Sequence, residues 1–246
     1  MSDQDKSRKV RDMFGAIAGR YDFLNHFLSA NIDRRWRKIC VREVSGRIPV
    51  PVPRILDIGC GTGDLSLAFS DLGPVIGCDF CHPMLRIGAG KVMHRSLSRP
   101  VALLGADALM LPFADASFDV VVSAFVLRNL ADIDRGLREM RRILRPGGVM
   151  SVLDFGMPRT PVLASIYRFY FLRVLPKLGK IISGVEGPYG YLPASVQSFP
   201  SAETLREKAE LAGFQNVEFK LLTAGVAVLL LGSAGSVRDP AGRIQT

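Results

Sequence analysis

A glycine-spaced turn directly follows the first apolar strand that the sequence predicts. Residues 54–58 are mostly apolar and lead into Gly59, Gly61 and Gly63, and Asp79 lies at the end of the next apolar run. Glycine lets a backbone approach a ligand where a Cβ would clash, and a carboxylate about 20 residues beyond the first glycine can accept hydrogen bonds from ribose hydroxyls. This layout is typical of an adenosine-cofactor site, with an ordinary strand–turn–helix as the simpler alternative.

The spacing of the turn also favours one cofactor. A dinucleotide site uses G-x-G-x-x-G, whereas this turn is G-x-G-x-G and has Asp64 at the position of the third glycine. A carboxylate there would repel a pyrophosphate at the start of the helix. S-adenosylmethionine has no phosphate, and its sulfonium and amino groups are cationic, so the turn favours this cofactor.

Further candidates lie at the carboxyl ends of the predicted strands, where open α/β sheets bind their ligands. Asp107 is placed to accept the adenine amino group, and Phe80 to lie against the ring. Each has a structural alternative: a turn cap for Asp107, a core side chain for Phe80 and a helix N-cap for Thr62. The candidate cofactor-binding residues are Asp57, Gly59, Gly61, Thr62, Asp79, Phe80, Asp107, Ala108 and Ser123.

A charged residue, Arg128, and the polar Asn129 follow the predicted strand at 118–124. A charge just past a buried strand is unfavourable unless it is paired or used. One interpretation is that Arg128 holds a nearby carboxylate such as Asp107. The other is that it takes part in the chemistry.

Apolar strands and amphipathic helices alternate after the prolines at 49, 51 and 53. We expect strands at 54–58, 74–79, 100–105, 118–124 and 148–154, and helices at 64–72, 82–94 and 132–144. Helical segments at 161–180 and 201–212 then precede apolar runs at 214–222 and 225–231, which are close enough to form a hairpin. The predicted fold is α/β: a Rossmann-like class I methyltransferase with a mostly parallel seven-stranded sheet, one antiparallel strand in a C-terminal hairpin, and helices on both faces.

The same pattern divides the chain into three parts. Residues 1–48 are expected to form a helical extension that covers the substrate site. Residues 49–232 are expected to form the methyltransferase domain, with 161–200 as a lid or substrate insertion. Residues 233–246, rich in Gly, Ser and charge, are expected to be a flexible tail.

Net charge, hydropathy and cysteine spacing limit the classes of partner that the protein is expected to bind. The net charge of +9 would attract nucleic acid or an anionic membrane, but no RNA-binding module or aromatic-studded basic stripe is present, so no nucleic-acid partner is expected. The start of the chain is polar, unlike a signal peptide, and no apolar run reaches the roughly 18 residues of a spanning helix. Cys78-x-x-Cys81 lacks a second pair and falls at the ribose position, so no metal is expected.

Several segments resemble the UbiE/MenG family of quinone C-methyltransferases, from about residue 9 to residue 232. They are Tyr21-Asp22-Phe23-Leu24-Asn25 with Ser29 and Trp36; Leu127-Arg128-Asn129; Arg142 to Gly148 with Leu153-Asp154-Phe155; and the stretches 189–192, 198–200 and 222–226. The chain departs from the family pattern at Asp33 and Leu230 (usually His), Leu24 (usually Met), Ala124 and Gly156 (usually Ser) and Asp154 (usually Glu).

The resemblance implies methyl transfer from S-adenosylmethionine to a ring carbon of a prenylated hydroquinone, reduced demethylmenaquinone, giving menaquinol. The alternatives are the ubiquinone-pathway benzoquinol intermediate or another small molecule. Arg128 is then expected to supply positive charge and, with Asn129, to orient a water that takes a proton. Tyr21 either closes this network or packs in the core. A cofactor-binding scaffold without activity is a rival, against which the intact Asp57, Asp79 and Arg128 argue.

The segment 161–180 combines apolar residues with interspersed arginines and lysines. It is expected either to lie on an anionic bilayer or to form a core helix whose cations reach solvent. The first interpretation makes the protein cytoplasmic and peripheral on the inner face of the membrane, in transient contact with its surface. A homodimer is a candidate assembly.

Overall fold

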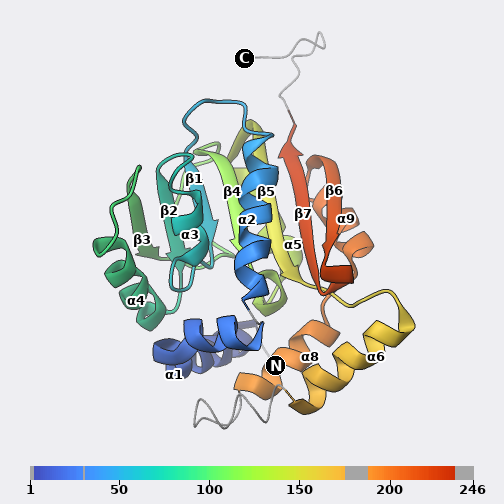
Figure 1. Cartoon of the computed structure of the whole chain (residues 1–246). Helices are drawn as coiled ribbons and strands as arrows, with labels where there is room; N and C mark the ends of the chain where they lie inside the picture. Colours follow the sequence, from blue (N-terminus) through green and yellow to red (C-terminus); the bar gives the residue numbers. More distant parts are fainter. Residues whose placement is uncertain (1–2, 30, 175–187, 236–246) are drawn as a thin grey trace.

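The computed structural model describes residues 3–29, 31–174 and 188–235, and within them one seven-stranded sheet carries the fold (Figure 1). Its strand order is β3-β2-β1-β4-β5-β7-β6. The strands are β1 (Ile55–Ile58), β2 (Val75–Asp79), β3 (Val101–Gly105), β4 (Phe118–Ala124), β5 (Leu144–Phe155), β6 (Phe214–Leu222) and β7 (Ala227–Ala234). Pairing is parallel from β3 through β5, and β7 runs antiparallel to both β5 and β6. The predicted fold class is confirmed.

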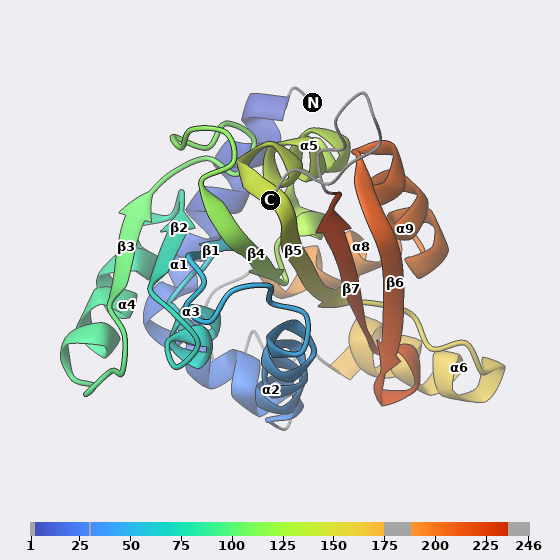
Figure 2. The same cartoon turned by 90° about the horizontal axis from the view of Figure 1, so that it is seen from above.

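Helices cover both faces of the sheet, which is why the residues of β1 and nearly all of β4 are buried. The helices are α1 (Asp3–Leu28), α2 (Ile32–Ser45), α3 (Asp64–Phe69), α4 (His82–Met93), α5 (Ile133–Ile143), α6 (Pro161–Phe169), α8 (Pro188–Gln197) and α9 (Ala202–Leu211). Leu137 of α5 and Leu205 of α9 belong to the core on one face, and Trp36 of α2 and Phe69 of α3 to the core on the other. Figure 2 shows α2 and α9 on opposite sides of the sheet.

The first two helices, α1 and α2, pack at different places on the sheet. α2 packs on a face of the sheet, where the Trp36 indole donates to the Thr223 hydroxyl at 2.9 Å. α1 instead lies below the edge at which the parallel strands end, beside α8 and α6 (Figure 1). Within the predicted helical extension, α1 therefore lines the cavity directly, whereas α2 reaches it through Trp36 and Arg37, which pack against the cavity-lining residue Phe125.

Three details differ from the sequence-based expectation. α5 continues directly into β5 at Leu144 without the expected loop, and the pairing of β4 with β5 shifts register between Phe118 and Val120. α8 was not expected, because Pro193 lies inside it. Ser233 and Ala234, assigned to the tail, pair within the sheet. Residues 175–180 of the predicted helix and 236–246 of the predicted tail lie outside the described residues.

Candidate active site

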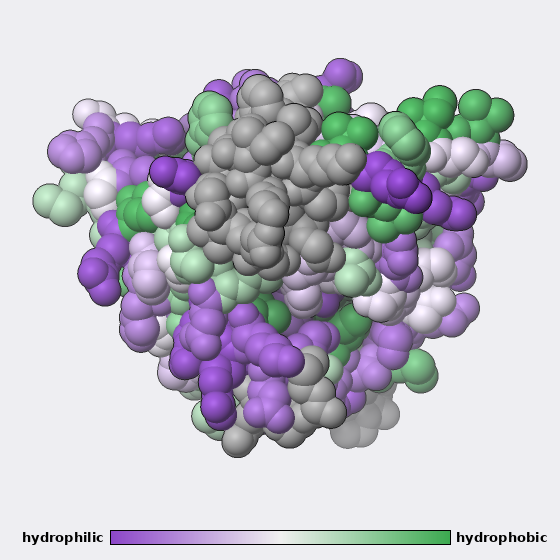
Figure 3. All heavy atoms as spheres, turned by 90° about the horizontal axis from the view of Figure 1, so that it is seen from below, coloured by the Kyte–Doolittle hydropathy of each residue, from purple (hydrophilic) through white to green (hydrophobic). Residues whose placement is uncertain are grey.

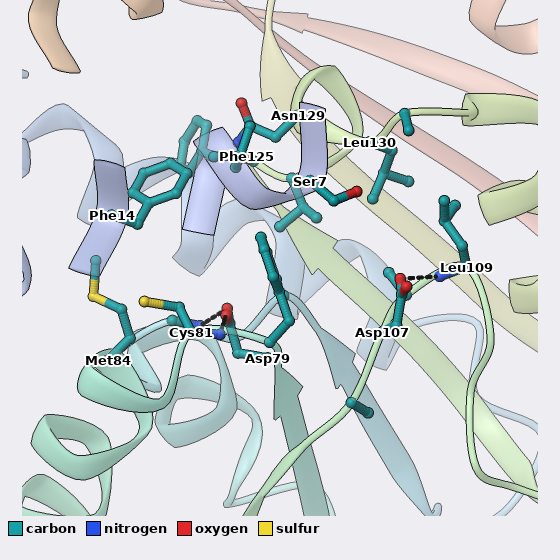
Figure 4. A pocket seen from close by; sticks show the side chains of 18 of the residues that line it. Ser7, Phe14, Asp79, Cys81, Met84, Asp107, Leu109, Phe125, Asn129 and Leu130 are labelled. Carbon is teal, nitrogen blue, oxygen red and sulfur yellow. Dashed lines mark hydrogen bonds between the residues drawn. The ribbon is translucent and has the colours of Figure 1, made fainter. Parts of the chain in front are cut away.

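A cavity of about 800 Å³ lies beyond the carboxyl ends of β1, β2 and β4 (Figure 4). The strand order reverses here, with β1 between β2 and β4, which is where doubly wound sheets bind ligands. The sheet loops and α1 together supply its lining: Ser7, Val10, Phe14, Tyr21, Gly59, Gly61, Asp79, Phe80, Cys81, Met84, Ala106, Asp107, Ala108, Leu109, Ala124, Phe125, Val126, Asn129, Leu130 and Ala131. Two carboxylates and no basic side chain belong to this set, so the cavity suits a cationic ligand.

The glycine turn after β1 has left-handed backbone angles, with φ of +66° at Gly59 and +55° at Gly61. A Cβ on Gly59 would lie 2.4 Å from the Val126 side chain, so this glycine permits close packing of the turn against the end of β4. A Cβ on Gly61 would meet no atom within 4 Å. Gly61 therefore presents bare backbone to the open cavity, and any side chain there would project into ligand space.

The carboxylate of Asp79 is held by the turn itself. One oxygen accepts the Gly61 N–H at 2.8 Å and the other accepts the Cys81 N–H at 2.8 Å. Burial raises the pKa of Asp79, and these two N–H groups oppose the rise by stabilising the carboxylate. Each oxygen keeps a further acceptor position, so Asp79 is oriented in advance to receive a pair of hydroxyls from the cavity.

The residues predicted to contact adenine also lie together in the structure. Phe80, Asp107 and Ala108 line the cavity, and one oxygen of Asp107 accepts the Leu109 N–H at 2.9 Å (Figure 4). The turn-cap interpretation of Asp107 therefore holds, and it does not compete with a ligand role, because the same side chain borders the cavity.

Three predicted cofactor residues lie outside the cavity lining. Thr62 donates to Asp22 at 2.5 Å and accepts from Lys91 at 2.9 Å. Ser123 donates to the Ile58 carbonyl at 2.9 Å. Asp57 lies beneath the turn, where it accepts the Ser66 hydroxyl at 2.6 Å, and burial raises its pKa to about 7. All three support the turn or its neighbouring elements from behind.

An ion-pair network fastens α1 to the turn. Lys91 contacts Asp22 of α1 at 2.5 Å and Asp64 of α3 at 2.7 Å. Burial alone would raise the pKa of Asp64, but the hydrogen bond and charge of Lys91 hold it below its usual value. His26 of α1 adds contacts with Asp33 at 2.8 Å and Asp64 at 3.5 Å. The helix that closes the cavity is therefore tied to the residues that start α3.

Arg128 is buried and paired, though not with Asp107. It is only 8% exposed, and its Nη1 donates to Asp154 Oδ1 at 2.7 Å. Its guanidinium also lies over the Phe155 and Phe125 rings, at 5.0 and 5.9 Å from their centroids. Asp154 is the family departure that the sequence showed, yet its partnership with Arg128 was not predicted, because the two residues are 26 positions apart on different strand ends.

Asn129 and Tyr21 reach the cavity itself. The Asn129 amide donates to the Phe125 carbonyl at 3.1 Å, which orients its Oδ1 away from that bond. Tyr21 packs edge-on against Phe14 and also lines the cavity, and its part in a network with Arg128 stays a prediction. Phe125, which sequence reasoning missed, has φ of +64°. For an aromatic residue this backbone region is strained, which is a common signature of functional positions.

Comparison with known proteins assigns the chain to a family. The family model described as the ubiE/COQ5 methyltransferase family matches residues 2–233. The chain belongs to the ubiE/COQ5 methyltransferase family. It is 47% identical to a demethylmenaquinone methyltransferase of Thermus thermophilus over 89% of this chain and 99% of that protein. It is 39% identical to a ubiquinone/menaquinone biosynthesis C-methyltransferase UbiE of a Geobacter species, over 93% of this chain and 97% of that protein.

Solved structures of more distant proteins share the ubiE/COQ5 fold. An S-adenosylmethionine-dependent methyltransferase of Thermotoga maritima superposes with a TM-score of 0.61 at 21% identity, covering 91% of this chain and 98% of that chain. The [4+2]-cyclase SpnF superposes with a TM-score of 0.61 at 19% identity, covering 80% of each chain. At such identities the likeness concerns the fold alone, and the two described activities differ.

As a ubiE/COQ5 methyltransferase, the protein uses S-adenosylmethionine as its methyl donor, and the cavity fits this cofactor. Gly61 leaves open space, Asp79 has free acceptor positions, and the lining carries carboxylates without basic side chains. Among the described residues, no group of three or more His, Cys, Asp or Glu side chains could hold a metal ion.

Proposed function

We propose that this enzyme methylates a ring carbon of reduced demethylmenaquinone and so forms menaquinol. Relatives at 47% and 40% identity carry the name demethylmenaquinone methyltransferase. The observation that carries the proposal is the Arg128–Asp154 pair, a buried cation at the end of β4 next to Asn129, which lines the cofactor cavity. A buried positive charge beside the methyl donor is what a phenolate-forming acceptor requires.

S-adenosylmethionine supplies an electrophilic methyl group on a sulfonium. The acceptor's ring carbon becomes nucleophilic when the neighbouring hydroxyl loses its proton. Arg128 stabilises the resulting oxyanion, and Asp154 keeps the guanidinium in place. Because arginine stays protonated, it cannot take the proton, so Arg128 and Asn129 orient a water that does. Tyr21 closes the site from α1. The ring-carbon proton then leaves to restore the aromatic ring.

The ubiquinone-pathway benzoquinol is the second candidate acceptor. Relatives at 39% and 40% identity are named ubiquinone/menaquinone biosynthesis C-methyltransferase UbiE. The deciding experiment offers labelled S-adenosylmethionine to reduced demethylmenaquinone and, separately, to the demethylated benzoquinol, in detergent. We expect label in menaquinol. Label in both products adds the second activity, and label in neither, with the cofactor bound, overturns the proposal. The oxidised quinones serve as the unreactive control.

The prenyl tail of such an acceptor calls for access from a membrane, and α6 has a suitable surface. Val162, Ile166 and Phe169 follow helical spacing and are 74%, 61% and 64% exposed. Arg168 and Arg173 are exposed beside them, as suits an anionic lipid surface. In Figure 3, apolar atoms lie at the right-hand side of the lower face, where α6 lies in Figure 1. No described helix is both long and apolar enough to cross a bilayer.

We infer that this face of α6 rests on the inner surface of the membrane in a peripheral, salt-sensitive contact. Sedimentation with vesicles of phosphatidylcholine and phosphatidylglycerol tests it. Ile166→Asp with Phe169→Asp should weaken binding about tenfold or more. The matched control is Leu211→Asp, since Leu211 is an 87% exposed apolar residue on α9. Equal binding of both variants would contradict the assignment of α6.

A further inference from the structure

Three buried polar atoms, one of them on a residue that lines the cavity, have no hydrogen-bond partner among the described residues. They are Arg128 Nε, Asn129 Oδ1 and the Tyr191 hydroxyl of α8. Most buried polar atoms in proteins are paired, because an unpaired one costs stability. A cluster of exceptions beside a ligand cavity indicates that the ligand supplies the missing partners.

The three atoms belong to one neighbourhood. Arg128 and Asn129 lie in the turn η1 (Leu127–Asn129), against which α8 packs. The charges of Arg128 and Asp154 both act on the Tyr191 hydroxyl, and burial raises the pKa of that hydroxyl, so it remains a donor at neutral pH. Phe125 joins this neighbourhood to the cofactor cavity, because its ring both lines the cavity and contacts the Arg128 guanidinium.

The chemistry of the three atoms is complementary to a ring with two oxygens. Arg128 Nε can only donate a hydrogen bond, and the oriented Asn129 Oδ1 can only accept one. Together they suit one hydroxyl, directly or through a water. The Tyr191 hydroxyl comes from a different element, α8. It is available for a second oxygen on the far side of an aromatic ring that lies against Phe125.

We propose that Tyr191 is a specificity-determining residue that hydrogen-bonds the second oxygen of a two-oxygen aromatic acceptor, while Arg128 and Asn129 serve the oxygen next to the methylated carbon. This inference rests on the proposed function and deepens it. It explains why α8, within the segment predicted as a substrate insertion, brings a tyrosine against η1. The group transferred and the proton released are those of the methyl transfer itself.

The test compares Tyr191→Phe with the wild type on two acceptors: a prenylated 1,4-dihydroxynaphthalene and its analogue without the second hydroxyl. In the wild type we expect kcat/KM to favour the two-oxygen acceptor about 10- to 100-fold. Tyr191→Phe should lose this preference, chiefly through KM, and leave the one-oxygen acceptor and cofactor affinity unchanged. Phenylalanine fills the same volume, so a packing defect would lower activity on both acceptors equally.

The matched control is Tyr170→Phe, which removes a hydroxyl near the end of α6. Burial alone raises the pKa of Tyr170, with no influence from Arg128, so this variant should keep the wild-type preference. If Tyr191→Phe retains the preference for two oxygens, the inference is wrong while the proposed function stands. If the wild type methylates neither acceptor, the proposed function itself is wrong.

Discussion

The polar groups on the cofactor side and on the proposed acceptor side of the cavity differ in whether the protein supplies their hydrogen-bond partners. On the cofactor side, both oxygens of Asp79 and one of Asp107 already accept backbone N–H groups. On the acceptor side, Arg128 Nε and Asn129 Oδ1 are buried and unpartnered among the described residues. The carboxylates of the first side are therefore oriented by the backbone before binding, whereas these two atoms of the second side have no partner among the described residues. We expect such a site to orient the methyl donor through its preset carboxylates and to select its acceptor through the groups that have no partner among the described residues.

The strongest way to break this comparison is Arg128→Ala. Removing the charge that we propose stabilises the oxyanion should lower kcat by about 10³-fold, while cofactor affinity should change less than about threefold, because Asp79 and the glycine turn are unaltered. Turnover assays and isothermal titration with S-adenosylmethionine measure the two effects. If Arg128→Ala kept a kcat close to that of the wild type, then Arg128 would have no role in the mechanism.

A stability control belongs with that variant, because it leaves the Asp154 carboxylate buried without its partner. We expect Arg128→Ala to lower the melting temperature, and the double variant Arg128→Ala, Asp154→Ala to recover most of the loss. Turnover should stay absent in both. Recovered turnover in the double variant would mean that misfolding, and not lost charge, inactivates the single variant.

The reciprocal variant on the cofactor side is Asp79→Asn. An amide group would replace one acceptor oxygen with a donor that faces the Gly61 or Cys81 N–H, so cofactor affinity should fall about 100-fold. Turnover at saturating cofactor should remain within about tenfold of the wild type. Asp71→Asn, which alters an exposed carboxylate bonded to Ser98, should change neither quantity. If Asp79→Asn lowered kcat as much as Arg128→Ala does, then Asp79 would contribute to turnover as well as to cofactor binding, and the proposed separation of roles would be wrong.

The buried carboxyl group of Asp57, beneath the glycine turn, predicts that stability depends on pH. Burial raises the pKa of Asp57 from 3.8 to about 7, so between about pH 4 and 7 the folded state holds a proton that the unfolded state has released. The free energy of unfolding therefore falls as pH rises through this range. Asp57→Asn lacks this loss and should gain ~3 kcal/mol relative to the wild type between pH 4.5 and 7.5, since a pKa unit corresponds to about 1.4 kcal/mol. Urea unfolding at both pH values measures it, and a constant difference would exclude the elevated pKa.

The smallest expected effect concerns the network that ties α1 to the turn. Lys91→Met removes the contacts to Asp22 and Asp64 but leaves both ligand sides intact. Partly exposed ion pairs contribute modestly, so we expect cofactor affinity to fall about threefold, and less at high salt. An unchanged affinity at low salt would show that packing alone holds α1 over the cavity.

Much of the cofactor side could be predicted because it depends on local signals. Gly59, Gly61 and Asp79 are read from glycine spacing and strand ends, and they line the cavity as a set. Thr62 and Ser123 share those strand ends, yet their hydroxyls bond Asp22 and the Ile58 carbonyl. The direction of a side chain within a turn depends on partners distant in sequence, so spacing alone could not separate the two groups.

The acceptor side was less accessible to prediction. The sequence placed Arg128 and Asn129 after a buried strand, but the choice of Asp154 over Asp107 as the arginine's partner depends on how β4 and β5 pair. α8 was missed because Pro193 weakens the helical pattern, and tertiary packing against η1 and α1 overrides that local preference.

The alternation of strands and helices, the parallel sheet with its final hairpin, the glycine turn with its acidic partner, and the family could all be predicted from the amino-acid sequence. These follow from hydrophobic periodicity and from backbone conformations that few residues tolerate. Which polar groups are already paired, and which have no partner among the described residues, became visible in the three-dimensional structure. That distinction depends on distances between residues far apart in the chain, such as Arg128, Asp154 and Tyr191, which only the folded packing brings together.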